Sequence, residues 1–242
     1  MNCINCNTEL SSNYCPDCGQ PSKLRRINAH YIVHEIEHVL HFERGIFHTI
    51  RELVVHPGRT IKRYLNENRS RLVKPIAFIV ITSLVYSIAV NFFHVEDHYV
   101  NLDDRELSDK MLVTTSFFKW VQGHYGYANI LMGIFIAFWT KLFFRKYEYN
   151  FFELLILLCF VMGIGMLIYA VFGIIEGLTH TKVMQIAGMI GLGYTVWAIG
   201  NFFNKNKVSS YLKALASYLL GMLTFLILST VITITIDILI KH

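Results

Sequence analysis

Charged residues are scarce in this chain of 242 residues. Asp, Glu, Lys and Arg make up only 16% of it, and 54% of its residues are hydrophobic. Soluble domains carry about a quarter charged residues. The mean hydropathy is +0.43. This shortage of charge excludes an ordinary soluble domain, because so much apolar surface needs a bilayer around it.

Long apolar runs take the place of the missing charge. Crossing about 30 Å of hydrocarbon takes about 20 helical residues. Five stretches are long and apolar enough: 75–93, 125–144, 154–175, 183–203 and 214–236. The second contains Lys141, whose long side chain can reach an interface by snorkelling. The sequence therefore predicts an all-α integral membrane protein, with about five transmembrane helices in residues 75–242.

Lys and Arg are spread unevenly between the loops. They are concentrated in residues 1–74, 145–151 and 204–213, whereas in the loop at 94–124 six Asp and Glu outnumber three Lys and Arg. Cytoplasmic loops carry the excess of Lys and Arg in membrane proteins. We therefore expect a cytoplasmic N-terminus and a C-terminus on the outside.

No signal peptide precedes the four N-terminal cysteines, so we expect residues 1–22 to stay in the reducing cytosol. The pairs Cys3-x2-Cys6 and Cys15-x2-Cys18 have the spacing of a zinc ribbon, because each pair turns two sulfurs toward one ion. The short segment between them cannot bury a core, so zinc would supply most of the folding energy. The prediction is a structural zinc bound by all four cysteines. Redox thiols and an iron–sulfur cluster are the alternatives.

Lys and Arg are absent from this ribbon. Contacts with nucleic-acid phosphates need cations. We therefore expect no nucleic acid here, and a cytosolic protein is the expected partner of the ribbon.

Residues 23–74 form a basic juxtamembrane segment with eleven of the 22 Lys and Arg. Helical spacing predicts one amphipathic helix within 27–43, a second at 46–55 and a basic third at 59–69. Arg44-Gly45 and Pro57-Gly58 are predicted to form the turns between them. We expect these helices to lie at the membrane interface. The residues predicted to bind anionic lipid headgroups are Arg59, Lys62, Arg63, Arg69, Arg71 and Lys74. Nucleic-acid binding by this patch is the weaker alternative.

The same segment contains a match to a catalytic motif, His34-Glu35-Ile36-Glu37-His38. A hydrolase would use His34 and His38 as zinc ligands and Glu35 as the general base. His30, Glu37 or His41 would complete the ligand set. However, six histidines crowd residues 30–56, so such a string arises there easily by chance. A solvated polar helix face is the preferred interpretation, and a non-catalytic metal site is a second alternative.

Ionisable residues are missing from the middle of the predicted spans. Glu153, Glu176 and Asp237 lie near span ends, whereas a proton or ion relay needs such a residue at depth. Glycines in the third and fourth spans indicate close helix packing. A broken-helix binding site of the transporter type is the alternative interpretation of these glycines.

Several motifs stand close together in the first third of the chain. They are the four-cysteine ribbon, Phe42-Glu43-Arg44-Gly45, Thr49-Ile50-Arg51-Glu52-Leu53, His56-Pro57-Gly58, Ile61-Lys62-Arg63-Tyr64-Leu65 and Lys74-Pro75. This set resembles a bacterial membrane-protein family of unknown function, which combines an N-terminal zinc ribbon with several membrane helices. The resemblance implies a place in the bacterial cytoplasmic membrane and no catalytic residues.

We therefore expect a non-enzymatic docking, sensing or scaffold protein with a cytosolic zinc ribbon. A membrane-embedded metal-dependent hydrolase using residues 34–38 is the first alternative. A small-solute transporter or channel subunit is the second.

Overall fold

The computed structural model describes Cys6, Thr8, Glu9, Pro16 and Asp17, and residues 45–69, 71–93, 112–123 and 125–241. The chain divides into two compact units, Met1–Glu43 and Arg44–His242. In the first unit, the Cys6 thiol donates to the Thr8 hydroxyl at 3.4 Å, and that hydroxyl donates to Asp17 at 2.8 Å. The helix predicted within 27–43 lies outside the described residues.

Two short helices open the second unit, α2 (Ile46–Val55) and α3 (Pro57–Asn66). The prediction of a helix at 46–55 is confirmed. Gly45 has φ of +77°, a left-handed conformation that glycine adopts without a steric penalty. The predicted turn at Pro57-Gly58 is wrong, because these two residues are the first of α3. Proline suits this position, since the first helical N–H has no partner within the helix.

Five longer helices follow: α4 (Pro75–Phe92), α7 (Tyr125–Phe143), α8 (Phe151–Thr179), α9 (Met184–Asn204) and α10 (Val208–Lys241). Four of them, α4, α8, α9 and α10, are long and apolar enough to cross a membrane. The described apolar part of α7, Tyr127–Phe143, is shorter. Four predicted spans are thus confirmed as helices of the required kind. A membrane crossing by α7 stays a prediction.

Two connections differ from the sequence-based prediction. The predicted loop at 94–124 contains α6 (Leu112–Gly123). The predicted loop at 204–213 is mostly helical, because α10 begins at Val208. Between α7 and α8 the chain forms only a short 3₁₀ helix, η3 (Arg145–Tyr147).

Close contacts at glycines show how the long helices run. A Cβ at Gly163 would lie 2.6 Å from the Phe78 ring, and one at Gly177 would lie 2.3 Å from Phe93. The residue numbers of α4 and α8 rise together along this contact, so the two helices are parallel. Glu176, near the end of α8, accepts from the backbone N–H of Met184 at the start of α9, so α9 runs antiparallel to α8.

Helix α7 completes this alternation of directions. Lys141 near its C-terminus donates to the Tyr149 carbonyl just before α8, so α7 ends where α8 begins. Since α4 ends at the opposite end of α8, the chain between Phe93 and Phe151 must return along the bundle. Helix α7 makes that return.

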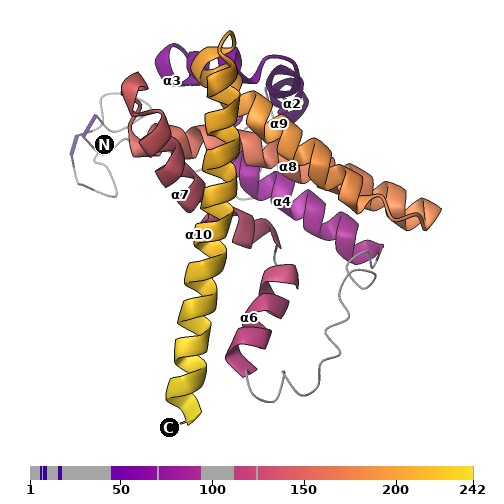
Figure 1. The fold of residues 1–242 in the computed structure, drawn as a ribbon. Helices are drawn as coiled ribbons and strands as arrows, with labels where there is room; N and C mark the ends of the chain where they lie inside the picture. The colour runs from indigo at the N-terminus through magenta and orange to yellow at the C-terminus, as the bar shows by residue number, and fades with distance from the viewer. Residues whose placement is uncertain are drawn as a thin grey trace. The chain divides into compact units, whose positions relative to one another are not determined.

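The C-terminus of α7, the start of α8, the C-terminus of α9 and the start of α10 therefore meet at one end of the bundle. Figure 1 shows α2 and α3 at this end, beside the connection between α9 and α10. Aromatic rings join its turns: the rings of Phe144 and Phe203 stack with centroids 3.7 Å apart, and those of Tyr149 and Phe202 lie 4.8 Å apart. We call this the basic end, because α3, η3 and residues 205–207 bring their Lys and Arg there.

The two short helices share the core of the long ones. Leu53 and Ile61 are fully buried in the same hydrophobic cluster as Phe160 and Phe202. The Tyr194 hydroxyl of α9 donates to the Leu53 carbonyl at 3.1 Å. The Val73 N–H donates to the buried Thr49 hydroxyl oxygen at 3.2 Å. Helices α2 and α3 are thus packed against the bundle as part of its core.

Candidate functional site

A groove lies at the basic end between α3 and the C-terminal end of α9, and its volume is about 770 Å³. The lining residues come from both helices and the turns beside them: His56, Gly58, Arg59, Lys62, Arg63, Asn66, Glu67, Asn201, Phe203, Asn204 and Lys205. Small-molecule sites commonly measure about 300–1,000 Å³. The groove is therefore large enough for an organic ligand.

Gly58 sets how closely its two walls approach. A Cβ at this position would lie 2.5 Å from the Asn201 backbone carbon and 2.6 Å from its carbonyl oxygen. Backbone atoms cannot move aside as a flexible side chain can, so only glycine permits this contact. The sequence suggested a turn for Gly58, whereas its role is to seat α3 directly on α9.

The cations of the groove differ in their surroundings. Arg59 and Lys205 are exposed, whereas Lys62 and Arg63 are half-buried. The Lys62 amine lies 5.7 Å from the centroid of the Phe202 ring, within reach of a cation–π contact. Burial lowers the pKa of Lys62 below its usual 10.5, because it removes water from the charged amine. Arg63 forms an ion pair with Glu67 at 3.4 Å.

The structure brings together only part of the predicted headgroup-binding set. Arg59, Lys62 and Arg63 line the groove. Arg71 lines a smaller pocket next to it, together with Arg63. Arg69 and Lys74 are exposed but line neither of these pockets.

The α9 wall of the groove was not predicted from the sequence. Its residues, Asn201, Asn204 and Lys205, lie at the end of a predicted span and were counted as part of the helix and the next loop. A signal was present, since two amides one turn apart followed by a lysine are unusual at the end of an otherwise apolar helix. The pairing of α9 with α3, however, is not visible in the sequence.

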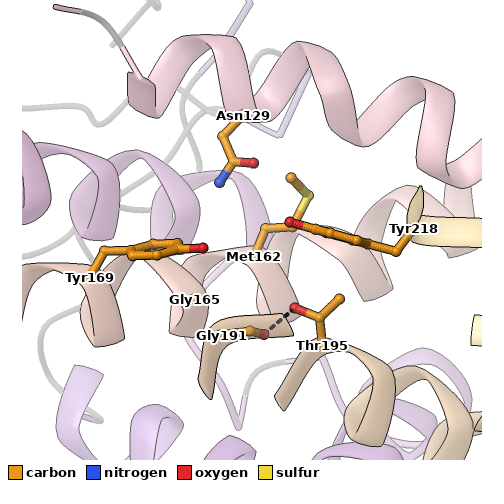
Figure 2. Close-up of a pocket in the computed structure, with 7 residues that line it drawn as sticks. All are labelled: Asn129, Met162, Gly165, Tyr169, Gly191, Thr195 and Tyr218. Atoms are coloured by element: carbon orange, nitrogen blue, oxygen red, sulfur yellow. Dashed lines mark hydrogen bonds between the residues drawn. The ribbon is translucent and has the colours of Figure 1, made fainter. Parts of the chain in front are cut away.

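A second, much smaller cavity lies within the bundle and is shown in Figure 2. Four helices line it, through Asn129 of α7, Met162, Gly165 and Tyr169 of α8, Gly191 and Thr195 of α9, and Tyr218 of α10. The polar ends of Asn129, Tyr169 and Tyr218 point toward a common space (Figure 2). The Thr195 hydroxyl donates to the Gly191 carbonyl at 2.8 Å.

This polar cavity lies deep in the bundle but is very small. Counting 1.5 Å per helical residue from Phe151 to Gly165 and from Asn204 to Thr195 places it about 14–21 Å from the basic end. That is near the middle of about 30 Å of hydrocarbon. Its free volume is about 10 Å³, roughly what one water molecule requires. The cavity therefore has room for a water molecule and not for a larger solute.

The glycines of α8 and α9 serve two purposes. Gly163, Gly177 and Gly200 permit tight contacts, as predicted, but a Cβ at Gly165 or Gly193 would meet no heavy atom within 4 Å. Helices α8 and α9 run without a break over Phe151–Thr179 and Met184–Asn204. The broken-helix interpretation of these glycines is therefore wrong.

The three acidic residues near the span ends all cap helix N-termini. Glu153 forms a capping box with Asn150 at the start of α8. Glu176 accepts from the backbone N–H groups of Val183 and Met184 at 2.8 and 3.0 Å. Asp237 of α10 accepts from two backbone N–H groups at the start of α6, at 2.8 and 3.0 Å. Each carboxylate thus satisfies donors that a helix start leaves open.

Most of the predicted metal chemistry falls outside the described residues. This applies to Cys3, Cys15 and Cys18 of the ribbon and to His34, Glu35 and His38 of the hydrolase motif. Cys6 is described and exposed. Within the described part of the chain, no group of three or more His, Cys, Asp or Glu is placed to hold a metal ion. Because three of the four cysteines lie outside the described residues, the zinc ribbon stays a prediction.

Comparison with known proteins bears on the segment that builds one wall of the groove. Residues 43–87 match the model of a family described as "Protein of unknown function (DUF3667)". The match covers α2, α3 and most of α4, and does not include the cysteines. Together with the apolar helices, it fits an uncharacterised membrane protein family. No curated protein and no solved structure matches the chain.

Proposed function

We propose that this chain is a non-enzymatic docking or scaffold protein of the bacterial cytoplasmic membrane, which holds a zinc ribbon at the cytoplasmic membrane surface. One observation carries the proposal: cationic side chains from three separate parts of the chain gather at one end of an apolar helix bundle. These parts are α3, η3 and residues 205–207. A one-sided excess of Lys and Arg is typical of a cytoplasmic face.

The helix directions support the proposed topology. Helix α4 leaves the basic end, α7 returns to it, α8 leaves, α9 returns and α10 leaves again. Five crossings are an odd number, so a cytoplasmic N-terminus goes with a C-terminus outside. Although α7 is short by its described apolar length, its return along the bundle favours counting it as a crossing.

The fixed position of α3 supports the docking role. Arg59, Lys62, Arg63, Arg69, Arg71 and Lys74 form what we call the basic platform. Each Lys or Arg near an anionic surface contributes about 1 kcal/mol. Because α2 and α3 share the core of the bundle, this attraction would act on a rigid element, which begins at Ile46 and follows the ribbon segment after residues 23–45. A zinc bound by Cys3, Cys6, Cys15 and Cys18 would fold the ribbon on the cytoplasmic side, available to a cytosolic protein partner.

The two alternatives have less support. The hydrolase needs His34, Glu35 and His38 in a water-excluding site, and these residues have no described surroundings. The transporter needs space for a solute, whereas the polar cavity has room for about one water molecule.

Metal analysis separates the docking protein from the hydrolase. We expect one tightly held zinc per purified chain, lost in Cys15→Ser and retained in a His34→Ala/His38→Ala double variant. A second zinc that disappears with the two histidines would support the hydrolase. A metal-free chain would remove the ribbon from the proposal.

Reporter fusions test the topology. Fusions to a cytoplasm-active reporter should be active within 205–207 and inactive after His242, with the opposite pattern for a reporter active outside. Activity of the same reporter at both positions would mean that α10 does not cross, and the proposed orientation would be wrong.

A further inference from the structure

We propose that the groove between α3 and the C-terminal end of α9 is a defined binding site for the phosphate group of an anionic phospholipid. This inference rests on the proposed function, because it takes the basic end as a membrane face. It goes further in assigning one bounded site, half of which is built from α9, in place of a diffuse attraction to the whole basic platform.

The groove presents more positive than negative charge. Among its lining residues, Arg59, Lys62, Arg63 and Lys205 are cationic, whereas Glu67 is the one carboxylate and is paired with Arg63. The guanidinium group of Arg59 can offer two parallel N–H donors to one phosphate. A carboxylate ligand could bind the same cations, but it has fewer acceptor oxygens than a phosphate. It would therefore leave some of the N–H donors of the groove without an acceptor.

Neutral donors complete the lining. Asn66 stands on the α3 wall, and Asn201 and Asn204 on the α9 wall. Amide N–H₂ groups suit phosphate or glycerol oxygens, and they add selectivity that cations alone do not give. The contact at Gly58 holds the two walls at a fixed separation, since α3 cannot move closer to the Asn201 backbone. A site of this kind is preorganised, which reduces the entropic cost of binding.

The position of the groove favours a lipid as the source of the phosphate. Lys205 directly follows the last residue of α9, so the groove lies where the apolar span ends. Phe203 lines the groove beside the cations, and Lys62 extends over the Phe202 ring. Both rings are buried, but exposed apolar side chains follow at the start of α10, where Val208 and Leu212 lie just beyond Lys205 in the chain. They suit a headgroup whose acyl chains continue along the bundle. A free phosphate would have no use for these apolar side chains.

The test uses the full chain, purified in a neutral detergent and stripped of lipid. Three probes are titrated: short-chain phosphatidylglycerol, short-chain phosphatidylcholine and inorganic phosphate. Binding is followed by the shift in Tm and by native mass spectrometry. The groove variant is Arg59→Gln/Lys205→Gln, and the matched control is Arg69→Gln/Lys74→Gln, which removes two exposed platform cations outside the groove. All four residues are exposed, so both variants should fold.

We expect phosphatidylglycerol to raise the Tm of the wild type and of the control variant alike. The groove variant should bind it about tenfold more weakly or worse, since hydrogen bonds to charged groups are lost. The control should stay within about twofold, because Arg69 and Lys74 do not line the groove and no extended anionic membrane surface is present in detergent to attract them. Phosphatidylcholine should bind more weakly than phosphatidylglycerol, and inorganic phosphate should produce no comparable shift.

Four outcomes would overturn the inference, each in a different way. An equal shift with inorganic phosphate, lost in the groove variant, would identify a soluble ligand. Equal weakening in both variants would replace the groove by a diffuse platform and leave the proposed function standing. If neither variant bound phosphatidylglycerol more weakly than the wild type, headgroup binding would be removed from both proposals. A groove variant that is less stable without lipid, but gains the wild-type shift with it, would mean that its cations only offset the negative end of α9.

Discussion

Replacing Gly221 by alanine should separate α7 from α10. Gly221 of α10 faces Ile136 of α7 so closely that a Cβ would lie 2.6 Å from its Cγ1, 2.7 Å from its Cα and 2.8 Å from its backbone nitrogen. Ordinary contacts begin at 3.4 Å. The two backbones must therefore move apart by about 0.7 Å, the difference between 3.4 and 2.7 Å.

The cost of this movement can be bounded. Overpacking a tight interface costs about 1–3 kcal/mol, and alanine returns up to about 1 kcal/mol of helix propensity. The hydrogen bond from the Trp139 indole to the Thr224 hydroxyl, 2.9 Å long, crosses the same interface and would also lengthen. We expect Gly221→Ala to lower the free energy of unfolding by about 1–2 kcal/mol, or Tm by about 2–8 °C for a chain of this size.

Thermal unfolding in detergent, followed by circular dichroism, measures the effect. Gly193→Ala is the control, because a Cβ there would meet no heavy atom within 4 Å. It should leave Tm unchanged or raise it slightly through helix propensity. If Gly221→Ala were as stable as this control, the close approach of α7 and α10 would be wrong.

Three further predictions concern single side chains. Burial raises the pKa of Tyr64 above 10.0, so its neutral form contributes stability that is present below pH 10.0 and lost as pH rises further. Between pH 9 and 11, about one unit either side of the ordinary pKa, the Tm of Tyr64→Phe should therefore fall less than the Tm of the wild type. Equal falls in Tm would contradict this. Asp237→Ala should cost about 0.5–2 kcal/mol of stability as a lost cap and should speed hydrogen exchange at the start of α6. Asp237→Asn should partly restore the protection from exchange. Unchanged exchange in both variants would contradict the cap. Thr49→Val should cost about 1–3 kcal/mol, because it leaves the Val73 N–H buried without its acceptor, and a Tm equal to that of the wild type would show that this bond contributes nothing.

The sequence predicted the elements whose signals are local. The apolar stretches 75–93 and 183–203 became α4 and α9 with ends shifted by one residue, since the absence of charge over about 20 residues is itself the signal. The bounds of α2 were predicted correctly because a left-handed glycine precedes it and a proline follows it closely. These signals need no knowledge of the rest of the fold.

Features that depend on distant contacts were not predictable. Helix α6 was missed because the carboxylate that caps it, Asp237, lies 124 residues later in the chain than Val113. A turn was predicted at Gly58 because no neighbouring residue in the sequence indicates that the Asn201 backbone lies against this glycine. The groove and the polar cavity were missed for the same reason, since their walls come from two and four helices respectively.

The length of α10 has a consequence for the membrane around it. Its 34 residues measure about 51 Å, against about 30 Å of hydrocarbon. Exposed apolar side chains continue to Ile240, so the excess cannot extend into water without exposing them. Such hydrophobic mismatch is relieved by tilting the helix or by thickening the surrounding lipid. Because Asp237 joins this part of α10 to α6, bilayer thickness would set the angle of both helices together.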